Sequence, residues 1–399
     1  MALLPVEDAL ARMLEGLQPT GAERVGLDEA LERTLAGPLA ARRDQPPFAA
    51  SAMDGYAVRA ADTASAPVEL AVVGEAKAGE GFSGRLKAGE AARIFTGAPV
   101  PRGADAVLMQ EDTEAASSGR VRVLQSVVAG TFIRPRGLDF ARGEVLLDTG
   151  RVLDARAIGL AAAMNNAEVM VRRRPEVAIL ATGDELVLPG GEPRSDQIVG
   201  SNGAALAAYV REAGAIPHDL GIAADDAAAI ARRLDMAGKA SLVVTIGGAS
   251  VGDHDLVHQA LNQLGIKLEF WKIAMRPGKP LLFARRGRQL IIGLPGNPVS
   301  AQVCARVFIG PVIERLLGRP GAVAPRTATL ADPLPANDQR QDYLRASIEH
   351  GPGGRLVARS FPRQDSSMQR VFAESHCLII RPPYAPAAEA GAEVAILPL

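Results

Sequence analysis

Glycine-rich loops follow two apolar runs of the sequence, and each loop leads into an amphipathic helix. The first loop follows Leu242–Ile246 and contains Gly247, Gly248 and Gly252, and the second follows Leu290–Ile292. Glycine lets the main chain approach a ligand closely, and the partial positive charge at a helix amino end favours anions. The loops match neither the dinucleotide pattern G-x-G-x-x-G nor the Walker pattern that ends in Lys-Ser or Lys-Thr. The spacing therefore predicts an oxyanion or phosphate site, or else tight turns that need glycine only for packing.

Carboxylates follow the same predicted strands. Glu185, Asp225, Asp253 and Asp255 each come shortly after an apolar run. In a parallel sheet the carboxyl ends of the strands share one edge, and ligands bind there. Carboxylates beside an anion site are typical of a hard cation such as Mg²⁺ that contacts both groups. The alternative interpretation is helix caps and surface charge, and Asp225 is predicted to cap the helix that begins at Ala227.

A basic group follows in the segment W-K-I-A-M-R-P-G-K-P, which contains Lys272, Arg276 and Lys279. Guanidinium and ammonium groups can clamp oxyanions through charge-assisted hydrogen bonds. The alternative is that all three are ordinary surface charges.

Two histidines offer a rival site. His254 and His258 are four residues apart, so on a helix they would share a face, as transition-metal ligands do. No His-Glu-x-x-His motif surrounds them and no third histidine or cysteine follows nearby, so we interpret them as a solvated first turn.

The elements that would position these residues form an alternating pattern of strands and helices from Glu176 onward. Short apolar runs alternate with segments of helical periodicity, which is typical of an open α/β sheet. Asn297 before Pro298 adds a good helix start. The expected strands are Val177–Ala181, His218–Ile222, Leu242–Ile246 and Leu290–Ile292, and the expected helices are Asn202–Ala213, Ala227–Leu234, one from Leu256 and one from Pro298.

The whole chain is predicted to be a multidomain α/β plus β protein. Residues 176–325 form the central α/β domain, 46–142 an all-β domain, and 326–399 a C-terminal β-domain like a barrel. Residues 1–45 and 143–175 form N-terminal helices and a small α+β domain, for which we expect helices over residues 5–16, Gly26–Leu35 and Asp154–Met164.

Composition excludes several classes of protein. The chain has 399 residues, 48% of them hydrophobic and 22% charged, with a formal net charge of −1, which argues against a general nucleic-acid binder. Two cysteines, Cys304 and Cys377, cannot form a disulfide framework and suit a reducing cytoplasm. We expect no signal peptide and no membrane span, because the first residues lack a basic region and no apolar run is long enough.

Seven motifs are spread over most of the chain: S-A-M-D-G-Y-A-V (51–58), T-G-A-P-V-P-R-G-A-D-A-V (96–107), I-R-P-R-G-L-D (133–139), A-T-G-D-E-L (181–186), G-G-A-S-V-G-D-H-D (247–255), M-R-P-G-K-P (275–280) and G-L-P-G-N-P-V-S (293–300). Together they resemble the molybdopterin molybdenumtransferase family, which carries out the last step of molybdenum cofactor synthesis, and they are similar to the gephyrin E-domain. The α/β motifs alone are shared with molybdopterin adenylyltransferases, and the motifs before residue 110 favour the molybdenumtransferase.

The resemblance implies elongated homodimers of four-domain subunits that use adenylylated molybdopterin and molybdate as substrates. Molybdenum is placed on the dithiolene and AMP is released, with Mg²⁺ or a similar cation. The glycine loops would hold the pterin phosphate and AMP, acidic residues the cation, and basic residues would steer molybdate. The cation would polarise the phosphoanhydride as a Lewis acid.

The residues that the resemblance implies fall into three groups. The catalytic positions are Asp54, Thr96, Asp139, Glu185, Asp225, Asp255, Lys272, Arg276 and Lys279, and the metal ligands among them are Glu185, Asp225 and Asp255. The substrate-binding positions are Thr182, Gly183, Gly247, Gly248, Ser250, Gly252, Pro295, Gly296, Asn297 and Pro298.

Three positions depart from the family pattern or leave a choice open. Arg276 stands where the family commonly has lysine, so a planar fork replaces a point charge. Ala249 replaces the usual valine of the glycine loop. Asp225 and Asp226 are adjacent, and we favour Asp225 as the functional carboxylate.

Two other functions fit the same motifs. One is a scaffold that binds partner proteins, as the gephyrin E-domain does, and the other is molybdopterin adenylyltransferase activity. The acidic and basic positions favour an enzyme, and a molybdopterin adenylyltransferase and molybdoenzyme maturation proteins are possible partners. Release of AMP from adenylylated molybdopterin on addition of molybdate would separate these functions.

Overall fold

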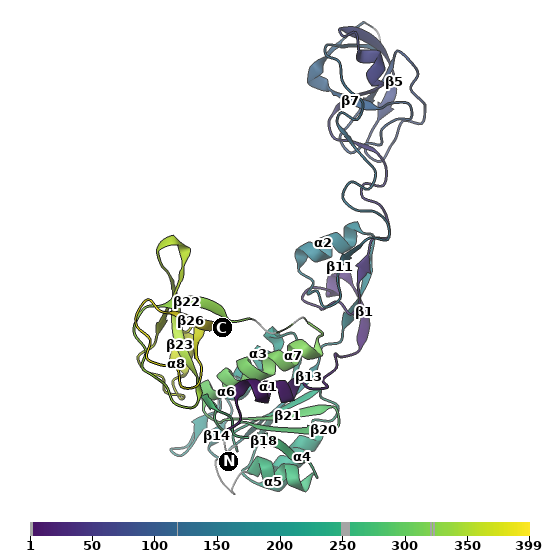
Figure 1. Cartoon of the computed structure of the whole chain (residues 1–399). Helices are drawn as coiled ribbons and strands as arrows, with labels where there is room; N and C mark the ends of the chain where they lie inside the picture. Colours follow the sequence, from purple (N-terminus) through teal and green to yellow (C-terminus); the bar gives the residue numbers. More distant parts are fainter. Residues whose placement is uncertain (1–2, 118, 249–255, 320, 322–323) are drawn as a thin grey trace. The chain divides into compact units, whose positions relative to one another are not determined.

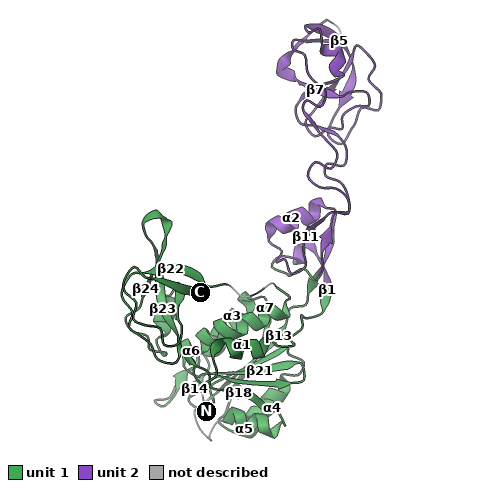
Figure 2. Cartoon of the chain, in the orientation of Figure 1, with its two compact units in different colours: residues 1–23, 32–36, 171–399 green, residues 24–31, 37–170 purple. Residues whose placement is uncertain are grey.

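A computed structural model describes residues 3–117, 119–248, 256–319, 321 and 324–399. The chain divides into two compact units (Figure 2). We call residues 1–23, 32–36 and 171–399 the main unit, and residues 24–31 and 37–170 the second unit. The main unit contains an α/β sheet and the C-terminal strands, and the second unit contains further strands and one α-helix (Figure 1).

A six-stranded sheet forms the centre of the main unit and confirms the predicted open α/β sheet. Neighbouring strands β16, β13, β17 and β21 are parallel, and β20 and β18 continue the sheet antiparallel. The side chains on both faces of the inner strands β17 and β21 are buried, as in other parallel sheets. The strands are β16 (Ile216–Ala223), β13 (Glu176–Thr182), β17 (Leu242–Ile246), β21 (Gln289–Leu294), β20 (Leu282–Arg286) and β18 (Leu268–Trp271).

Helices cover both faces of this sheet (Figure 1). Because successive strand residues point to opposite faces, Val177 and Ile179 pack in one core cluster while Ala178 and Leu180 pack in the other. The first face carries α1 (Val6–Leu14), α3 (Asn202–Glu212), α6 (Pro298–Cys304) and α7 (Gly310–Leu316), with a π-helical turn at Ala305–Ile309, and the second carries α4 (Ala227–Met236) and α5 (Leu256–Gln263).

The C-terminal strands close into a barrel, as predicted. Strand β23 pairs with both β24 and β25, which joins the two ends of the strand order and leaves fewer exposed edges. The predicted all-strand composition of residues 326–399 is incomplete, because a short helix, α8 (Gln369–Ala373), precedes β25. The barrel strands are β22 (Arg326–Leu330), β23 (Gln341–His350), β24 (Leu356–Ser360), β25 (Cys377–Arg381) and β26 (Glu393–Pro398).

The second unit contains a six-stranded sheet in the order β7-β4-β6-β5-β9-β8. It also contains α2 (Ala155–Ala163), which Asp154 caps by accepting a hydrogen bond from the Ala157 N–H at 2.8 Å. The sheet strands are β4 (Gly55–Val58), β5 (Val68–Ala76), β6 (Glu90–Ile94), β7 (Ala106–Met109), β8 (Thr113–Ala115) and β9 (Arg120–Val123). Shorter strands of the chain are β1 (Ala22–Gly26), β2 (Leu39–Ala40), β3 (Ala50–Ser51), β10 (Ile133–Arg134), β11 (Val145–Leu147), β12 (Glu168–Arg172), β14 (Leu186–Val187), β15 (Ile198–Val199) and β19 (Met275–Arg276).

The helix predicted over Gly26–Leu35 is wrong. Only a single 3₁₀ turn forms at Leu27–Glu29, and Glu32 has a left-handed φ of 62° that interrupts helical geometry. Further on, Leu35 forms a β-bridge with Val171. The main-chain groups of this segment therefore pair with a distant part of the chain, which overrides its local helical spacing.

A charged contact ties the barrel to the α/β part of the main unit, where β19 pairs with β23. Arg276 Nε donates to Asp342 Oδ1 at 2.9 Å, and a second guanidinium nitrogen donates to Oδ2. The side chain of Asp342 is 3% exposed and that of Arg276 is 46% exposed. The carboxylate therefore depends on Arg276 for compensation, whereas the guanidinium also reaches water.

We expect Arg276→Ala to lower the free energy of unfolding by about 3 kcal/mol or more, because it removes the guanidinium that hydrogen-bonds a buried carboxylate. Asp342→Asn should cost about 1 kcal/mol, because the remaining guanidinium can turn to solvent. Urea unfolding of the full chain measures both changes. Arg359→Ala is the matched control, since its two carboxylate partners are about half exposed. Equal losses of unfolding free energy in Arg276→Ala and Asp342→Asn would contradict the expectation that the buried carboxylate depends more on its partner than the guanidinium does.

Candidate functional site

A cavity of about 1040 Å³ opens within the main unit at the carboxyl ends of the parallel strands. Residues that follow β13, β17 and β21 form one side of it, which is the edge where ligands bind in open α/β sheets. The predicted residues that line it are Thr182, Gly183, Glu185, Asp225, Gly247, Gly248, Pro295, Gly296, Asn297 and Pro298.

The structure does not bring every predicted residue to this cavity. Lys272, Arg276 and Lys279 do not line it, although the neighbouring Pro280 does. Ser250, Gly252 and Asp255 lie outside the described residues, as does the rival His254. Asp54, Thr96 and Asp139 belong to the second unit.

Two loops carrying carboxylates are fastened to each other at the cavity. The Asp225 N–H donates to Asp184 Oδ1 at 3.1 Å, and the Asp184 N–H lies 3.4 Å from Asp225 Oδ2. Glu185 folds back over Gly183, where an added Cβ would lie 2.5 Å from the carboxylate oxygen Oε2. The exchange of hydrogen bonds holds Asp225 and Glu185 at one edge of the sheet.

Asp226, not Asp225, caps α4. Its side chain accepts a hydrogen bond from the Ala229 N–H at 2.7 Å, so the predicted cap was placed one residue too early. The cap geometry leaves Asp225 facing the cavity. The spacing of acidic residues before a helix does not distinguish two adjacent aspartates, because only backbone conformation decides which of them is the cap.

Three carboxylates line the described part of the cavity, those of Glu185, Asp219 and Asp225, and the side chain of Asp219 already accepts a hydrogen bond from the Gly221 N–H at 2.8 Å. No group of three potential His, Cys, Asp or Glu ligands gathers among the residues the structure describes. Glu185 and Asp225 nevertheless offer hard oxygen donors at one cavity. This set fits Mg²⁺, which is commonly held by one or two carboxylates together with water and substrate phosphates.

The first glycine loop packs directly on Thr182. A Cβ on Gly247 would lie 2.6 Å from the Thr182 carbonyl oxygen, and one on Gly248 would lie 3.0 Å from the Thr182 hydroxyl. That hydroxyl is buried and has no hydrogen-bond partner among the described residues. A buried hydroxyl without a partner carries a desolvation cost, so it is available to a ligand in the cavity.

The barrel contributes to the cavity through the segment before α8. Ser367 lines the cavity, and Ser366 accepts a hydrogen bond from Asn297 Nδ2 at 2.9 Å. The Val299 N–H also donates to the Ser366 carbonyl at 3.0 Å. Asn297 thus occupies the predicted N-cap position, but its side chain does not cap α6 and instead holds the barrel segment.

Arg345 is a charged residue that sequence reasoning missed. It is fully buried, and Nε and both terminal nitrogens lack a hydrogen-bond partner within the described structure. Burial lowers the pKa of its guanidinium, and the charge of Asp365 acts in the opposite direction. Its main chain is bonded to the Gln364 side chain, at the start of the segment that carries Ser367. No local motif marks such a residue, because its meaning comes from burial.

Arg211 is a second residue that was missed. It is the only lysine or arginine among the described residues that line the cavity. Arg211 lies on α3 together with Ala204 and Ala207, at spacings of seven and four residues, and all three line the cavity. Helical periodicity could have placed these residues on one face of α3 but could not show that the face borders a ligand cavity.

The predicted basic group is distributed over different contacts. Lys272 Nζ lies 4.0 Å from the centre of the Trp271 ring, and Arg276 is paired with Asp342. The side chain of Lys279 is exposed, while its carbonyl accepts a hydrogen bond from the Ile273 N–H at 3.0 Å. The three residues therefore share a segment but not a common clamp.

In the second unit, the structure brings Asp54 and Thr96 together. Asp54 Oδ1 accepts hydrogen bonds from both the N–H and the hydroxyl of Thr96, each at 2.7 Å. The main-chain N–H of Thr96 is the largest cause of a lowered pKa for the Asp54 carboxyl, so this carboxyl is ionised. The Asp139 N–H donates to the Gln45 carbonyl at 2.9 Å.

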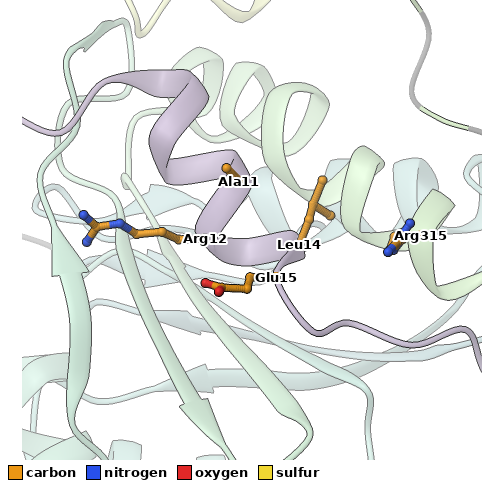
Figure 3. A pocket seen from close by; sticks show the side chains of 5 residues that line it. All are labelled: Ala11, Arg12, Leu14, Glu15 and Arg315. Carbon is orange, nitrogen blue, oxygen red and sulfur yellow. The ribbon is translucent and has the colours of Figure 1, made fainter.

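A smaller cavity of about 470 Å³ lies at the carboxyl end of α1 (Figure 3). Its lining includes Arg12, Glu15 and Arg315, so the carboxylate of Glu15 opposes the binding of an anion. None of the predicted site residues lines this cavity. The large cavity at the sheet edge is therefore the candidate site.

Comparison with known proteins assigns a family to this fold and cavity. Residues 4–165 match the model for the MoeA N-terminal region (domain I and II), residues 178–315 a probable molybdopterin binding domain, and residues 327–399 the MoeA C-terminal region (domain IV). The crystal structure of a molybdopterin biosynthesis MoeA protein from Pyrococcus horikosii is similar, with a TM-score of 0.87 and 30% identity over 99% of this chain and 98% of that one.

Two relatives are both named molybdopterin molybdenumtransferase. A molybdopterin molybdenumtransferase from Nostoc is 40% identical over 85% of this chain and 79% of its own length. The molybdopterin molybdenumtransferase from Haemophilus influenzae is 34% identical over 95% of this chain and 94% of its own. With motifs, fold and matches in agreement along the chain, the protein belongs to the molybdopterin molybdenumtransferase family.

Proposed function

We propose that this protein is a molybdopterin molybdenumtransferase, which inserts molybdate into adenylylated molybdopterin and releases AMP to form molybdenum cofactor. The observation that carries the proposal is the cavity in which glycine loops and the carboxylates of Glu185 and Asp225 share one edge of the α/β sheet. Matches to regions before and after the α/β part support this activity over that of an adenylyltransferase, and the carboxylates at the cavity favour an enzyme over a partner-binding scaffold.

In this proposal, each wall of the cavity has a role. The main chain after β17 and β21 binds the phosphate groups of the substrate, because glycine permits close approach of N–H groups. The Thr182 hydroxyl, which has no partner in the described residues, completes that contact. Ser250 and Gly252 of the same loop and Gly183, Pro295, Gly296, Asn297 and Pro298 are proposed binding positions on the same grounds of family resemblance and loop position.

A divalent cation, which we propose to be Mg²⁺, is held by Glu185 and Asp225 with Asp255 as a third ligand. The two described carboxylates supply hard oxygen donors beside the phosphate-binding loops. Bound there, Mg²⁺ supplies Lewis-acid polarisation of the phosphoanhydride. The hydrogen bonds between the Asp184 and Asp225 loops keep the ligand carboxylates in place before substrate binds.

Basic residues are proposed to bind the molybdate oxyanion. Lys272, Arg276 and Lys279 keep the roles that the family resemblance implies, and Arg345 adds a guanidinium from the barrel. A buried guanidinium that lacks an acceptor is compensated when an anion binds, which gives Arg345 a reason to be buried. Asp54, Thr96 and Asp139 are proposed to take part in the reaction from the second unit, because they match the family motifs.

We further propose that the protein works as a homodimer in the cytoplasm. The family resemblance supports both statements. None of the helices in the described ranges combines the length and apolarity needed to traverse a lipid bilayer.

The carboxylates provide the direct test of this function. We expect Glu185→Gln and Asp225→Asn each to lower molybdate-dependent release of AMP from adenylylated molybdopterin by about 100-fold or more at limiting Mg²⁺, as for loss of a preorganised electrostatic group. Excess Mg²⁺ should restore part of the activity. Asp226→Asn is the control, because asparagine still caps α4 and the activity should persist. Wild-type rates from both cavity variants would refute the proposed cation site.

A second prediction concerns Arg345. Arg345→Met should raise the molybdate concentration needed for half-maximal activity by about 10-fold, since one charge-assisted contact is worth roughly 1.5–3 kcal/mol. The same change should leave stability unchanged or raise it by about 1–4 kcal/mol, because an apolar side chain replaces a buried charge that lacks a partner. Thermal unfolding and molybdate titration of AMP release measure the two effects. A marked loss of stability with unchanged molybdate dependence would mean that Arg345 is structural.

A further inference from the structure

Arg93, on β6 of the second unit, joins the ends of three neighbouring segments. Its Nη1 donates to the Gly55 carbonyl at 3.0 Å, and its Nη2 donates to Gln110 Oε1 at 2.5 Å. The guanidinium carbon lies 5.2 Å from the ring centre of Tyr56 and 5.0 Å from that of Phe95. Rings and hydrogen bonds therefore fix the plane of the guanidinium as well as its position.

The groups that Arg93 holds are those on either side of Asp54. Gly55 follows Asp54 directly and begins β4, and the Gln110 N–H donates to the Asp54 carbonyl at 3.1 Å. A Cβ on Gly55 would lie 1.7 Å from the Leu108 carbonyl oxygen, so the strands approach as closely as main chains permit. Arg93 thus contacts Gly55, which follows Asp54. It also contacts the side chain of Gln110, whose N–H donates to the Asp54 carbonyl.

The other end of this arrangement is Thr96, which donates two hydrogen bonds to Asp54 Oδ1. Thr96 follows β6, the strand that carries Arg93, and Phe95 between them forms one face of the stack. The register pairs Arg93 with Tyr56 and Ile94 with Gly55. Movement of Arg93 would therefore alter both the aspartate and the threonine of the pair.

We infer that Arg93 is a positioning residue that sets the geometry of the Asp54–Thr96 pair, an inference that rests on the proposed role of this pair in the reaction. The contacts of Arg93 are a carbonyl, an amide oxygen and two rings, and no carboxylate lies within ion-pair distance of it in the described structure. The planar fork makes these contacts in a way that lysine cannot reproduce. The charge of Arg93 in addition helps to lower the pKa of the Asp54 carboxyl.

The test compares Arg93→Met and Arg93→Lys with a matched control, Arg120→Met. Arg120 lies on β9 of the same sheet and also donates to a main-chain carbonyl, that of Glu69, at 2.9 Å. We expect Arg93→Met to lower kcat for molybdate-dependent AMP release by about 10-fold or more with KM for molybdate unchanged, as when the support of a catalytic group is removed. Arg93→Lys should recover little of that loss, and Arg120→Met should match the wild type.

Selective ¹⁵N labelling of threonine in the full chain supplies a readout that is independent of activity. The Thr96 amide resonance should shift in both Arg93 variants and stay in place in Arg120→Met, because its acceptor Asp54 moves. In an Asp54→Asn background, Arg93→Met should cause no further loss of kcat, since coupled residues are not additive.

The outcomes distinguish the inference about Arg93 from the proposed role of the Asp54–Thr96 pair in the reaction. If Asp54→Asn is inactive while Arg93→Met has wild-type kcat and an unshifted Thr96 resonance, the inference about Arg93 is wrong. If Asp54→Asn is fully active, the proposed role of the pair fails, and the Thr96 resonance still decides whether Arg93 positions it. Loss of all dispersed threonine resonances in both Arg93 variants would show that Arg93 supports the whole sheet, which would also overturn the inference.

Discussion

The parallel register of β13, β17 and β21 is the constraint on which the candidate site depends. Ala181 pairs with Ile246, and Ile246 pairs with Leu294, so the three strands end at one level. The loops that begin at Gly183, Gly247 and Pro295 therefore leave the sheet at the same edge. A slip of two residues in one strand would displace its loop by roughly 7 Å and separate the carboxylates from the glycine loops.

Close packing between these loops shows that the two interpretations of the glycines are compatible. Gly247 needs to lack a side chain because the Thr182 carbonyl lies where a Cβ would stand, and its φ of 89° is left-handed. A Cβ on Gly296 would make only ordinary contact, at 3.7 Å from the Gly247 Cα. Packing therefore accounts for the first glycine but not for Gly296, where the lack of a side chain leaves the main chain open toward the cavity that it lines.

The sequence was most informative where spacing is local. It predicted β17 at Leu242–Ile246 and a helix over Asp154–Met164, where α2 forms, because apolar runs and helical periodicity are properties of nearby residues. It could not predict that Arg276 pairs with Asp342, which is 66 residues away, or that Asn297 bonds Ser366 instead of capping α6. Both side chains satisfy their polar groups through the barrel, and neither partner is marked by a motif.

Contacts between residues far apart in the sequence also bring the C-terminal barrel to the cavity, which Ser367 lines. Alternation along β23 places Tyr343 in the core cluster of the α/β part and Ala346 in that of the barrel. Arg345, two residues after Tyr343, consequently points to the α/β side but does not line the cavity, whose only described lysine or arginine is Arg211. An α/β sheet with acidic loops repels an anionic substrate unless positive charge is added. Among the described residues that line the cavity, Arg211 supplies that charge, while the buried guanidinium of Arg345 places a second positive charge on the barrel side without lining the cavity.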